Sequence, residues 1–462
     1  METRTLGWFG IFRLGLVQTA LGAIVVLTTS TMNRVMVVEL ALPAMLPGVL
    51  VGIHYAIQML RPRLGHGSDV GGRRTPWIVG GMVTLAAGGT LASLSIALMT
   101  TETTAGVLLA MAAFVLIGLG VGASGTSLLV LLAKQVAEPR RPAAATLVWT
   151  MMIVGFVITA GIAGSLLDPF SITRLVIVTA GVSAAAIVLT VVAVWGVEID
   201  GIDAQPGAHD SKPKVPFRRA LSEVWQEKQA RLFTIFVFVS MLAYSAQDLV
   251  LEPFAGAIFG MTPGESTRLA GMQHGGVLIG MGLVALAGRR ILGIRFGTLQ
   301  QWMTGGCVAS AAALGLLVAA AVVGPTWPLK PSVFALGIAN GAFAVAAIGH
   351  MMTLANAGRA RREGVRMGLW GAAQAVAFGI GGFLGTVIVD VVRWSSGMVA
   401  LSYGSVFAFQ AVLFVFSAVV AVVLSRTGSD ERTATRARGT ARNSLDAGLE
   451  MMAAPAFEKV KA

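Results

Sequence analysis

Long apolar stretches recur along almost the whole chain, and they constrain its fold more than any other feature. A helix that crosses a bilayer needs roughly 20 mainly apolar residues, because the membrane core offers no water to an exposed backbone. Twelve such stretches lie near residues 11–31, 42–60, 76–99, 106–132, 145–167, 174–196, 231–252, 269–287, 296–320, 332–355, 367–391 and 399–424. The sequence therefore predicts an all-α integral membrane protein with twelve transmembrane helices.

The positive charges lie mostly on one side of these predicted helices. Of the 34 Lys and Arg residues, the loops of one side hold only Arg34, Arg174, Arg268, Lys330 and Arg393. The others fall in the tails, at helix ends or in the opposite loops, and loops of that kind are typically cytoplasmic. We therefore expect both termini in the cytoplasm, and we attribute the net charge of +12 to topology rather than to nucleic-acid binding.

The second half of the chain resembles the first when it is shifted by 221 residues. The shift aligns Arg140-Arg141 with Arg361-Arg362, Trp149 with Trp370, Gly161 with Gly382 and Gly164 with Gly385. We predict four segments: an N-terminal six-helix bundle (1–197), a cytoplasmic central loop (198–230), a C-terminal six-helix bundle (231–425) and a disordered cytoplasmic tail (426–462). Two parallel six-helix repeats around a midplane cavity are typical of the major facilitator superfamily.

A glycine-rich loop with a single acidic residue lies between the second and third predicted helices. The loop has the pattern G-x-x-x-D-x-x-G-R-R, formed by Gly65, Asp69, Gly72, Arg73 and Arg74. This pattern resembles the signature loop of the major facilitator superfamily. Glycines permit a sharp turn, and the carboxylate can meet a helix N-terminus and a neighbouring arginine. We predict a conformational latch; the alternative is a loop whose arginines only fix the orientation of the chain.

Three strings resemble a narrower family. They are LTTSTMNRVMVVEL at 27–40, RPR at 61–63 and GHGSDVGGRR at 65–74, and they are similar to the PucC and LhaA family of phototrophic bacteria, also called the bacteriochlorophyll delivery family. The chain looks most similar to the branch named as a bacteriochlorophyll synthase chain. The resemblance implies a bacterial inner (intracytoplasmic) membrane and bacteriochlorophyll or a precursor as ligand, with no free metal ion. It also implies light-harvesting antenna polypeptides or bacteriochlorophyll synthase as partners.

Two histidines occupy nearly equivalent places in the repeats. His54 lies in the second predicted helix and His274 in the eighth, 220 positions apart. A neutral imidazole can bind a metal, and chlorin magnesium accepts one axial ligand as haem iron accepts a proximal histidine. We predict that both bind the pigment as axial magnesium ligands, with His350 as a further pigment-binding candidate. The alternative for each is a hydrogen bond between helices.

Uncharged polar side chains within the predicted helices are candidates to line the cavity between the halves. They are Gln18, Gln58, Gln273, Asn340 and Gln374. Hydrogen bonds across helices explain them equally well.

Charged side chains lie near the outer ends of the predicted helices. We interpret Asp248 and Glu252, four residues apart, as a solvated helix end, and Asp168 and Asp390 as interfacial residues. Asn33, Arg34 and Glu39 form a cluster for which we expect a salt link across the loop.

Three functions fit a fold of this kind. The first is a membrane carrier or assembly factor that binds and delivers (bacterio)chlorophyll to light-harvesting complexes or works with bacteriochlorophyll synthase. The second is a proton-coupled secondary transporter of a small solute. The third is an enzyme, but the one acidic cluster with diphosphate-binding spacing, Glu198, Asp200 and Asp203, lies in the hydrophilic loop. Nearly charge-free helix centres suit a large apolar ligand, so we predict the first function.

Overall fold

The computed structural model describes residues 5–60, 73–198, 222, 224–287, 297–357 and 363–453, and within them every regular element is a helix. The first half contains α1 (Trp8–Val26), η1 (Leu27–Thr31), α2 (Met32–Arg34), η2 (Val35–Glu39), α3 (Met45–Gln58), α5 (Thr75–Met99), α6 (Thr103–Gln135), η3 (Glu138–Arg140), α7 (Arg141–Leu166) and α8 (Ile172–Val194). The second contains α10 (Lys228–Asp248), α11 (Leu251–Phe259), α12 (Pro263–Ala287), α13 (Leu299–Val323), η4 (Gly324–Thr326), α14 (Leu329–Ala357), α15 (Glu363–Ser396) and α16 (Val399–Ala453).

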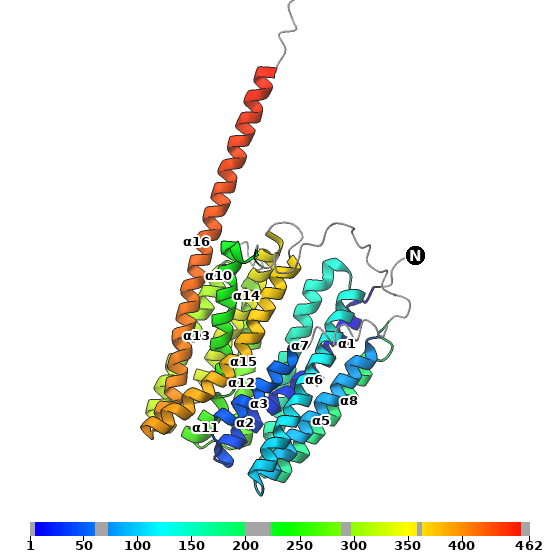
Figure 1. Cartoon of the computed structure of the whole chain (residues 1–462), viewed down its shortest axis with the longest axis vertical. Coiled ribbons are helices and arrows are strands. Elements are labelled where there is room, and N and C mark those ends of the chain that lie inside the picture. The colour runs from blue at the N-terminus through cyan, green and yellow to red at the C-terminus, as the bar shows by residue number, and fades with distance from the viewer. Residues whose placement is uncertain are drawn as a thin grey trace, which may run out of the picture.

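The long helices run side by side and give the molecule two distinguishable ends (Figure 1). We call the end where α1 begins and α16 leaves the bundle the tail end. We call the opposite end, with short connections such as 100–102 and 167–171, the turn end.

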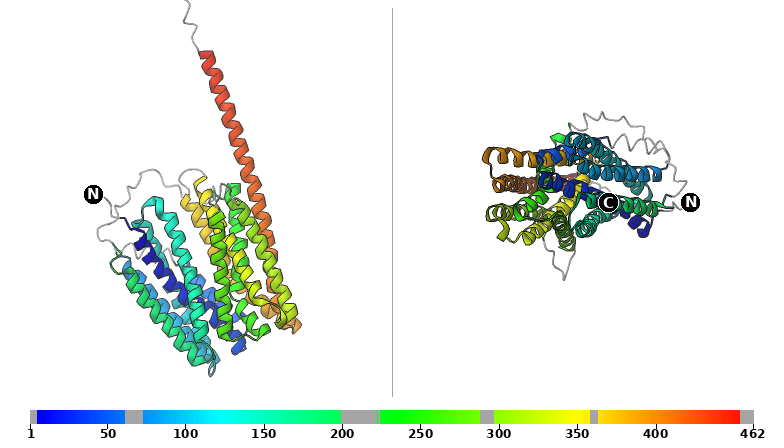
Figure 2. Two further views of the ribbon diagram at one scale, coloured as in Figure 1. Left: turned by 180° about the vertical axis from the view of Figure 1, so that it is seen from behind. Right: turned by 90° about the horizontal axis from the view of Figure 1, so that it is seen from below.

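Each half has its own hydrophobic core. One cluster of buried side chains is drawn from the first half with Leu249 added. The other is drawn from the second half with Val37 and Ala44 added. Figures 1 and 2 show the blue-to-teal helices of the first half beside the green-to-orange helices of the second. Val37, Ala44 and Leu249, which join the core of the opposite half, all lie at the turn end, so the two cores meet there.

The first helix is continuous over Trp8–Glu39, but it contains two π-helical turns. The Met32 amide bonds to the Leu27 carbonyl, and the Leu40 amide bonds to the Val35 carbonyl, each five residues back. Such turns rotate the residues that follow them and are frequent at functional sites. They flank α2, which carries Asn33 and Arg34.

Eleven helices within the described ranges are long and apolar enough to cross a membrane. The prediction of an all-α membrane fold is confirmed, but the second predicted span is shorter than expected. There α3 has only 14 residues, because the chain first reverses through Ala41, whose φ is +51°. The seventh predicted span ends at Asp248, and Glu252 belongs to the separate helix α11.

The sequence predicts a disordered tail from residue 426, whereas α16 continues as a helix to Ala453 (Figure 1). The membrane-spanning part of this helix ends at Thr427. The segment that follows lacks an apolar run, but it is rich in Ala and Arg and contains no Pro before Pro455. Ala and Arg are strong helix formers, which explains why a polar segment extends the helix.

Candidate functional site

The candidate site is the seam at which the two halves touch. Helix α12 packs on α7, and α15 packs on α3. Glycines bring the backbones together: a Cβ on Gly264 would lie 2.4 Å from the Gly164 oxygen, and one on Gly48 would lie 2.1 Å from Thr386 Oγ1. In a membrane such close approach is what holds helices together. The seam is therefore tightly packed towards the turn end.

Polar side chains of the first helix cross the seam near the turn end. Thr31 Oγ1 and Thr267 Oγ1 are 2.9 Å apart, and Asn33 Nδ2 donates to the Leu249 carbonyl. Arg34 donates to the Met261 carbonyl and pairs with Glu39. The expected salt link between Arg34 and Glu39 is confirmed, and the same arginine also ties the two halves together.

Glu252 lies in this network rather than in solvent. Its side chain is 1% exposed, and Oε2 accepts hydrogen bonds from Ser266 Oγ at 3.1 Å and Thr267 Oγ1 at 3.5 Å. The interpretation of Glu252 as a solvated helix end is wrong, because α11 folds back under the bundle and buries it. Buried polar atoms without a hydrogen-bond partner in the described part of the chain gather here: Asn33 Oδ1, Arg34 Nε and Glu252 Oε1.

Two aspartates make further polar contacts across the seam. Asp168 pairs with Arg268 at 2.9 Å and accepts from Thr262 Oγ1 at 2.8 Å, close to the start of α12. Asp390 accepts from the amides of Ala44 at 2.9 Å and Met45 at 2.6 Å, at the start of α3. Both aspartates were predicted only to be interfacial, yet each binds the opposite half.

His274 lies on α12 at the seam. Its Nδ1 is 2.8 Å from the Ala270 carbonyl oxygen and therefore carries the proton, because a carbonyl only accepts. Its ring meets Phe156 of α7 edge-on, with centroids 4.9 Å apart. Nε2 has no hydrogen bond within the part of the chain that the structure describes. A histidine whose other nitrogen is fixed by a carbonyl is arranged as metal-binding histidines usually are.

The other two histidines have different surroundings. His54 is buried at 3% exposure, and its Nε2 is 2.7 Å from Gln58 Nε2. His350 is partly buried beside Phe233 of α10, with ring centroids 5.7 Å apart. His54, His274 and His350 lie on three different helices, α3, α12 and α14, so the structure offers three candidate positions.

The polar cavity candidates are also dispersed. Gln18 Nε2 contacts Met152 Sδ at 3.2 Å, and Asn340 Oδ1 accepts from Ser310 Oγ at 2.9 Å. Gln273 is buried, whereas Gln374 on α15 is partly exposed. The hydrogen bond of Asn340 joins α13 and α14, as the interhelical alternative expects, whereas the contact of Gln58 with His54 lies within α3.

Most of the predicted latch, including Gly65, Asp69 and Gly72, lies outside the described residues. Just beyond it, Glu198 accepts hydrogen bonds from the Arg74 amide at 2.7 Å, the Thr75 amide at 3.0 Å and Thr75 Oγ1 at 2.7 Å. Partial burial raises the pKa of Glu198, but these hydrogen bonds and the charge of Arg73 outweigh it and leave the pKa below its usual value. Glu198 therefore caps α5 as a carboxylate.

A second carboxylate holds the other end of the central loop. Glu227 accepts a bidentate pair of hydrogen bonds from Arg366 of α15, with Nη2 and Oε2 2.7 Å apart. Arg366 is 1% exposed. Planar bidentate pairs of this kind are among the stronger polar contacts. The two ends of the central loop are thus fixed to the first turns of α5 and α15.

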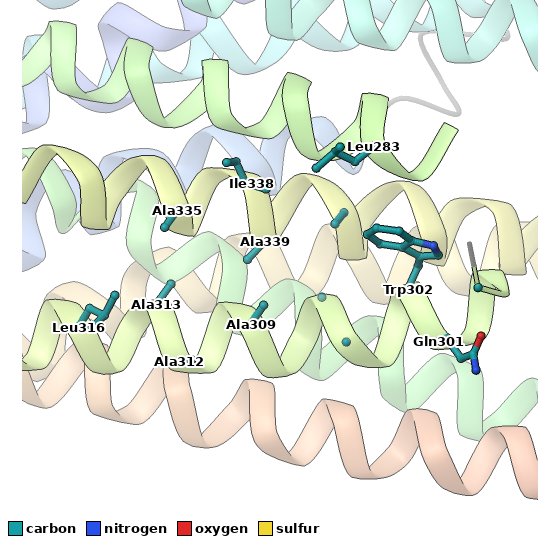
Figure 3. Close-up of a pocket in the computed structure, with 14 residues that line it drawn as sticks. Leu283, Gln301, Trp302, Ala309, Ala312, Ala313, Leu316, Ala335, Ile338 and Ala339 are labelled. Carbon is teal, nitrogen blue, oxygen red and sulfur yellow. The ribbon is translucent and has the colours of Figure 1, made fainter. Parts of the chain in front are cut away.

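The prominent groove of the structure does not lie at the seam. It measures about 650 Å³ and runs between α12, α13 and α14 (Figure 3). None of the histidines, glutamines or asparagines predicted to bind pigment or line a cavity belongs to its wall.

Comparison with known proteins identifies relatives along almost the whole chain. The family model described as PUCC protein matches residues 31–429. The bacteriochlorophyll synthase 44.5 kDa chain of Rhodobacter capsulatus is 51% identical over 417 residues, which cover 90% of this chain and 95% of that protein. Protein PucC of Rhodobacter capsulatus is 28% identical, with 90% and 92% covered.

Solved structures with the same architecture are transporters. A bacterial homologue of the human lysosomal transporter Spinster, inward-facing and unoccupied, has a TM-score of 0.65 at 16% identity, covering 91% of this chain and 97% of that one. The peptide transporter POT in complex with sulfate has a TM-score of 0.65 at 14% identity, covering 92% and 97%. At such identities the likeness shows the fold alone, and it confirms the predicted major-facilitator-like architecture.

Proposed function

Because this chain belongs to the PucC protein family, we propose that it is a membrane carrier or assembly factor that binds bacteriochlorophyll or a precursor. It delivers this pigment to light-harvesting complexes or works with bacteriochlorophyll synthase. The family and the relative named as a bacteriochlorophyll synthase chain support a role in the photosynthetic apparatus. The partners in this proposal are antenna polypeptides or the synthase.

The proposed location is the bacterial inner (intracytoplasmic) membrane, with both termini in the cytoplasm. The excess of Lys and Arg in the loops of the tail end supports this orientation. The tail end is then the cytoplasmic end.

The observation that carries the proposal is the imidazole of His274. Its Nε2 is a lone-pair donor at the seam, and the Ala270 carbonyl fixes the tautomer that leaves this nitrogen unprotonated. A chlorin presents an apolar ring and one open magnesium coordination position, which this nitrogen would fill. Phe156 adds an aromatic face next to the imidazole. The bound pigment would supply light absorption, while this chain would supply an axial ligand and the neighbouring ring of Phe156.

We propose that the chain carries pigment without chemically altering it. The relative's name is a subunit label, because it calls that protein one chain of a synthase. The family of the chain and its transporter-like fold support this proposal.

Copurification tests the proposal directly. The full chain, purified in mild detergent from a phototrophic host, should retain a near-infrared absorption band in stoichiometric amount. A host lacking pigment synthesis should yield the same protein without the band. Protein from the pigmented host that shows no band and takes up none on titration would remove the proposal.

Buried Glu252 favours a second candidate function, proton-coupled transport of a small solute. A buried carboxylate that bonds with hydroxyls near the seam is a common arrangement for a proton-binding residue. Uptake into vesicles that depends on a pH gradient and is abolished by Glu252→Gln would support this function. Pigment retention unaffected by Glu252→Gln would favour the first.

A further inference from the structure

The groove between α12, α13 and α14 is almost entirely apolar. Small side chains such as Ala309, Ala312 and Ala339 leave its floor open, while Leu283 and Trp302 form part of its wall (Figure 3). Ala309 and Ala312 are exposed in the structure. Because α13 and its neighbours are membrane-spanning helices, this groove opens to the hydrocarbon of the bilayer.

The length of the groove matches one leaflet. Along α13 it extends from Gln301 to Leu316, a rise of about 22 Å at 1.5 Å per residue. A bilayer is about 40–45 Å thick with its headgroup regions, so one leaflet with its headgroups contributes about 20–22 Å. The groove therefore begins at the membrane surface on the tail end and finishes near the bilayer centre.

A polar pocket continues the groove at the tail end. It measures about 370 Å³, shares Gln301 and Gly305 with the groove, and is also lined by Gln300, Thr304 and Arg426. Gln300 and Arg426 lie in the first turn of α13 and the last membrane-spanning turn of α16. Polar residues at such a depth meet the phosphates of the lipid headgroups.

The polar pocket has groups that match an anionic headgroup. Arg426 is exposed and forms no ion pair within the part of the chain that the structure describes. The N-terminus of α13 adds the positive end of a 25-residue helix. Gln300 Oε1 is buried and has no hydrogen-bond partner there, so it can accept from a headgroup hydroxyl.

We propose that this groove and pocket bind one anionic phospholipid, with an acyl chain along α13 and its phosphate at Arg426. A transmembrane helix of a partner fits less well, because a helix 10–12 Å across would fill roughly 1,700–2,500 Å³ over the same length. A partner's transmembrane helix would also need contacts across both leaflets, whereas the groove extends through only one leaflet. The proposal is independent of pigment binding, since the seam and the groove share no proposed ligand-binding residue.

Native mass spectrometry of the full chain tests the proposal. The purified protein is offered equal amounts of phosphatidylglycerol and phosphatidylcholine in mixed micelles. We expect the wild-type chain to retain one phosphatidylglycerol molecule with about fivefold preference, because one arginine near the membrane surface adds about that much attraction for an anionic lipid.

Three variants separate headgroup from chain recognition. Arg426→Ala should remove the preference, and Ala312→Phe should remove the retained lipid of either kind by filling the groove. Because Ala312 is exposed, its replacement does not overpack a core; Ala309→Leu repeats the test nearer the membrane surface. Arg231→Ala, an exposed arginine at the tail end that lines neither cavity, should behave as wild type.

Two results would overturn the proposal. One is an unchanged phosphatidylglycerol complement in Arg426→Ala and in both groove-filling variants. The other is equal thermal stabilisation by inorganic phosphate and by phosphatidylglycerol, which would show a phosphate site that needs no lipid.

Discussion

At the scale of single residues, two aspartates hold the halves together at the turn end. Asp168 of the first half binds Thr262 and Arg268 beside the start of α12. Asp390 of the second half accepts from two amides at the start of α3. A carboxylate is favourable at a helix N-terminus because it meets unpaired amides and the positive end of the helix dipole. Each half thus stabilises the start of a helix of the other half, α12 in one case and α3 in the other.

Arg34→Ala should destabilise the protein. The substitution leaves the partly buried Met261 carbonyl and Glu39 without their cation, and loss of a buried partner such as Arg34 costs about 1–3 kcal/mol. We expect a lower melting temperature in detergent. Arg174→Ala is the matched control, because Arg174 is a partly exposed turn-end arginine that bonds to Pro169 of its own half. Equal melting temperatures of Arg34→Ala and the wild type would contradict the role of Arg34 in joining the two halves.

Glu198 should make the first turn of α5 sensitive to acid. Its pKa in the folded chain is below the usual value, so the cap is fully present above the usual glutamate pKa, about 4.3, and is lost as pH falls through the lowered value. Hydrogen exchange in the first turn of α5, corrected for intrinsic rates, should accelerate in that acid range. In Glu198→Gln the acceleration should disappear, and the same acid response in this variant would contradict the cap.

At the scale of elements, α12 and α14 owe their close packing to glycines. A Cβ on Gly280 would lie 2.1 Å from the Ile338 oxygen, and one on Gly341 would lie 2.1 Å from the Val277 oxygen. Both obstacles are backbone atoms, which move only with the whole helix. The contact between α12 and α14 forms one side of the lipid-facing groove.

Gly280→Ala should therefore separate these two helices. Overpacking of this kind costs about 1–3 kcal/mol, and we expect a lower melting temperature together with altered lipid retention. Gly282→Ala is the matched control on the same helix, since a Cβ there would meet nothing within 4 Å. Indistinguishable melting of the two variants would show that the glycine contact does not determine the packing.

At the scale of the whole molecule, apolar stretches and the 221-residue repeat predicted the helices well, because lipid imposes length and composition on every span. These patterns did not predict which charged side chains are buried, because that burial depends on tertiary contacts. Glu252 next to Pro253 has the sequence of an exposed helix end, and only the fold of α11 shows it to be buried. The near-repeat of Asp168 and Asp390 was visible in the sequence, but their partners lie in the opposite half and follow no local pattern.

The predicted latch would act on the whole molecule. We expect Asp69→Asn to impair pigment accumulation while leaving the amount of protein in the membrane unchanged, because the substitution removes only a charge. Asp69 is the single acidic residue in a loop with Arg61, Arg63, Arg73 and Arg74. Cells with normal protein level would be compared by absorption spectroscopy. Normal pigment accumulation in these cells would remove the latch.

Titration of the purified chain with bacteriochlorophyll, followed by pigment fluorescence, tests whether the chain binds pigment through His274. We expect saturable binding that His274→Leu weakens about tenfold or more, which corresponds to about 1.4 kcal/mol. His54→Leu should weaken it less, because His54 Nε2 already meets Gln58. Circular dichroism would confirm that each variant is folded. Wild-type affinity in the His54→Leu, His274→Leu double variant would contradict pigment binding by these two histidines.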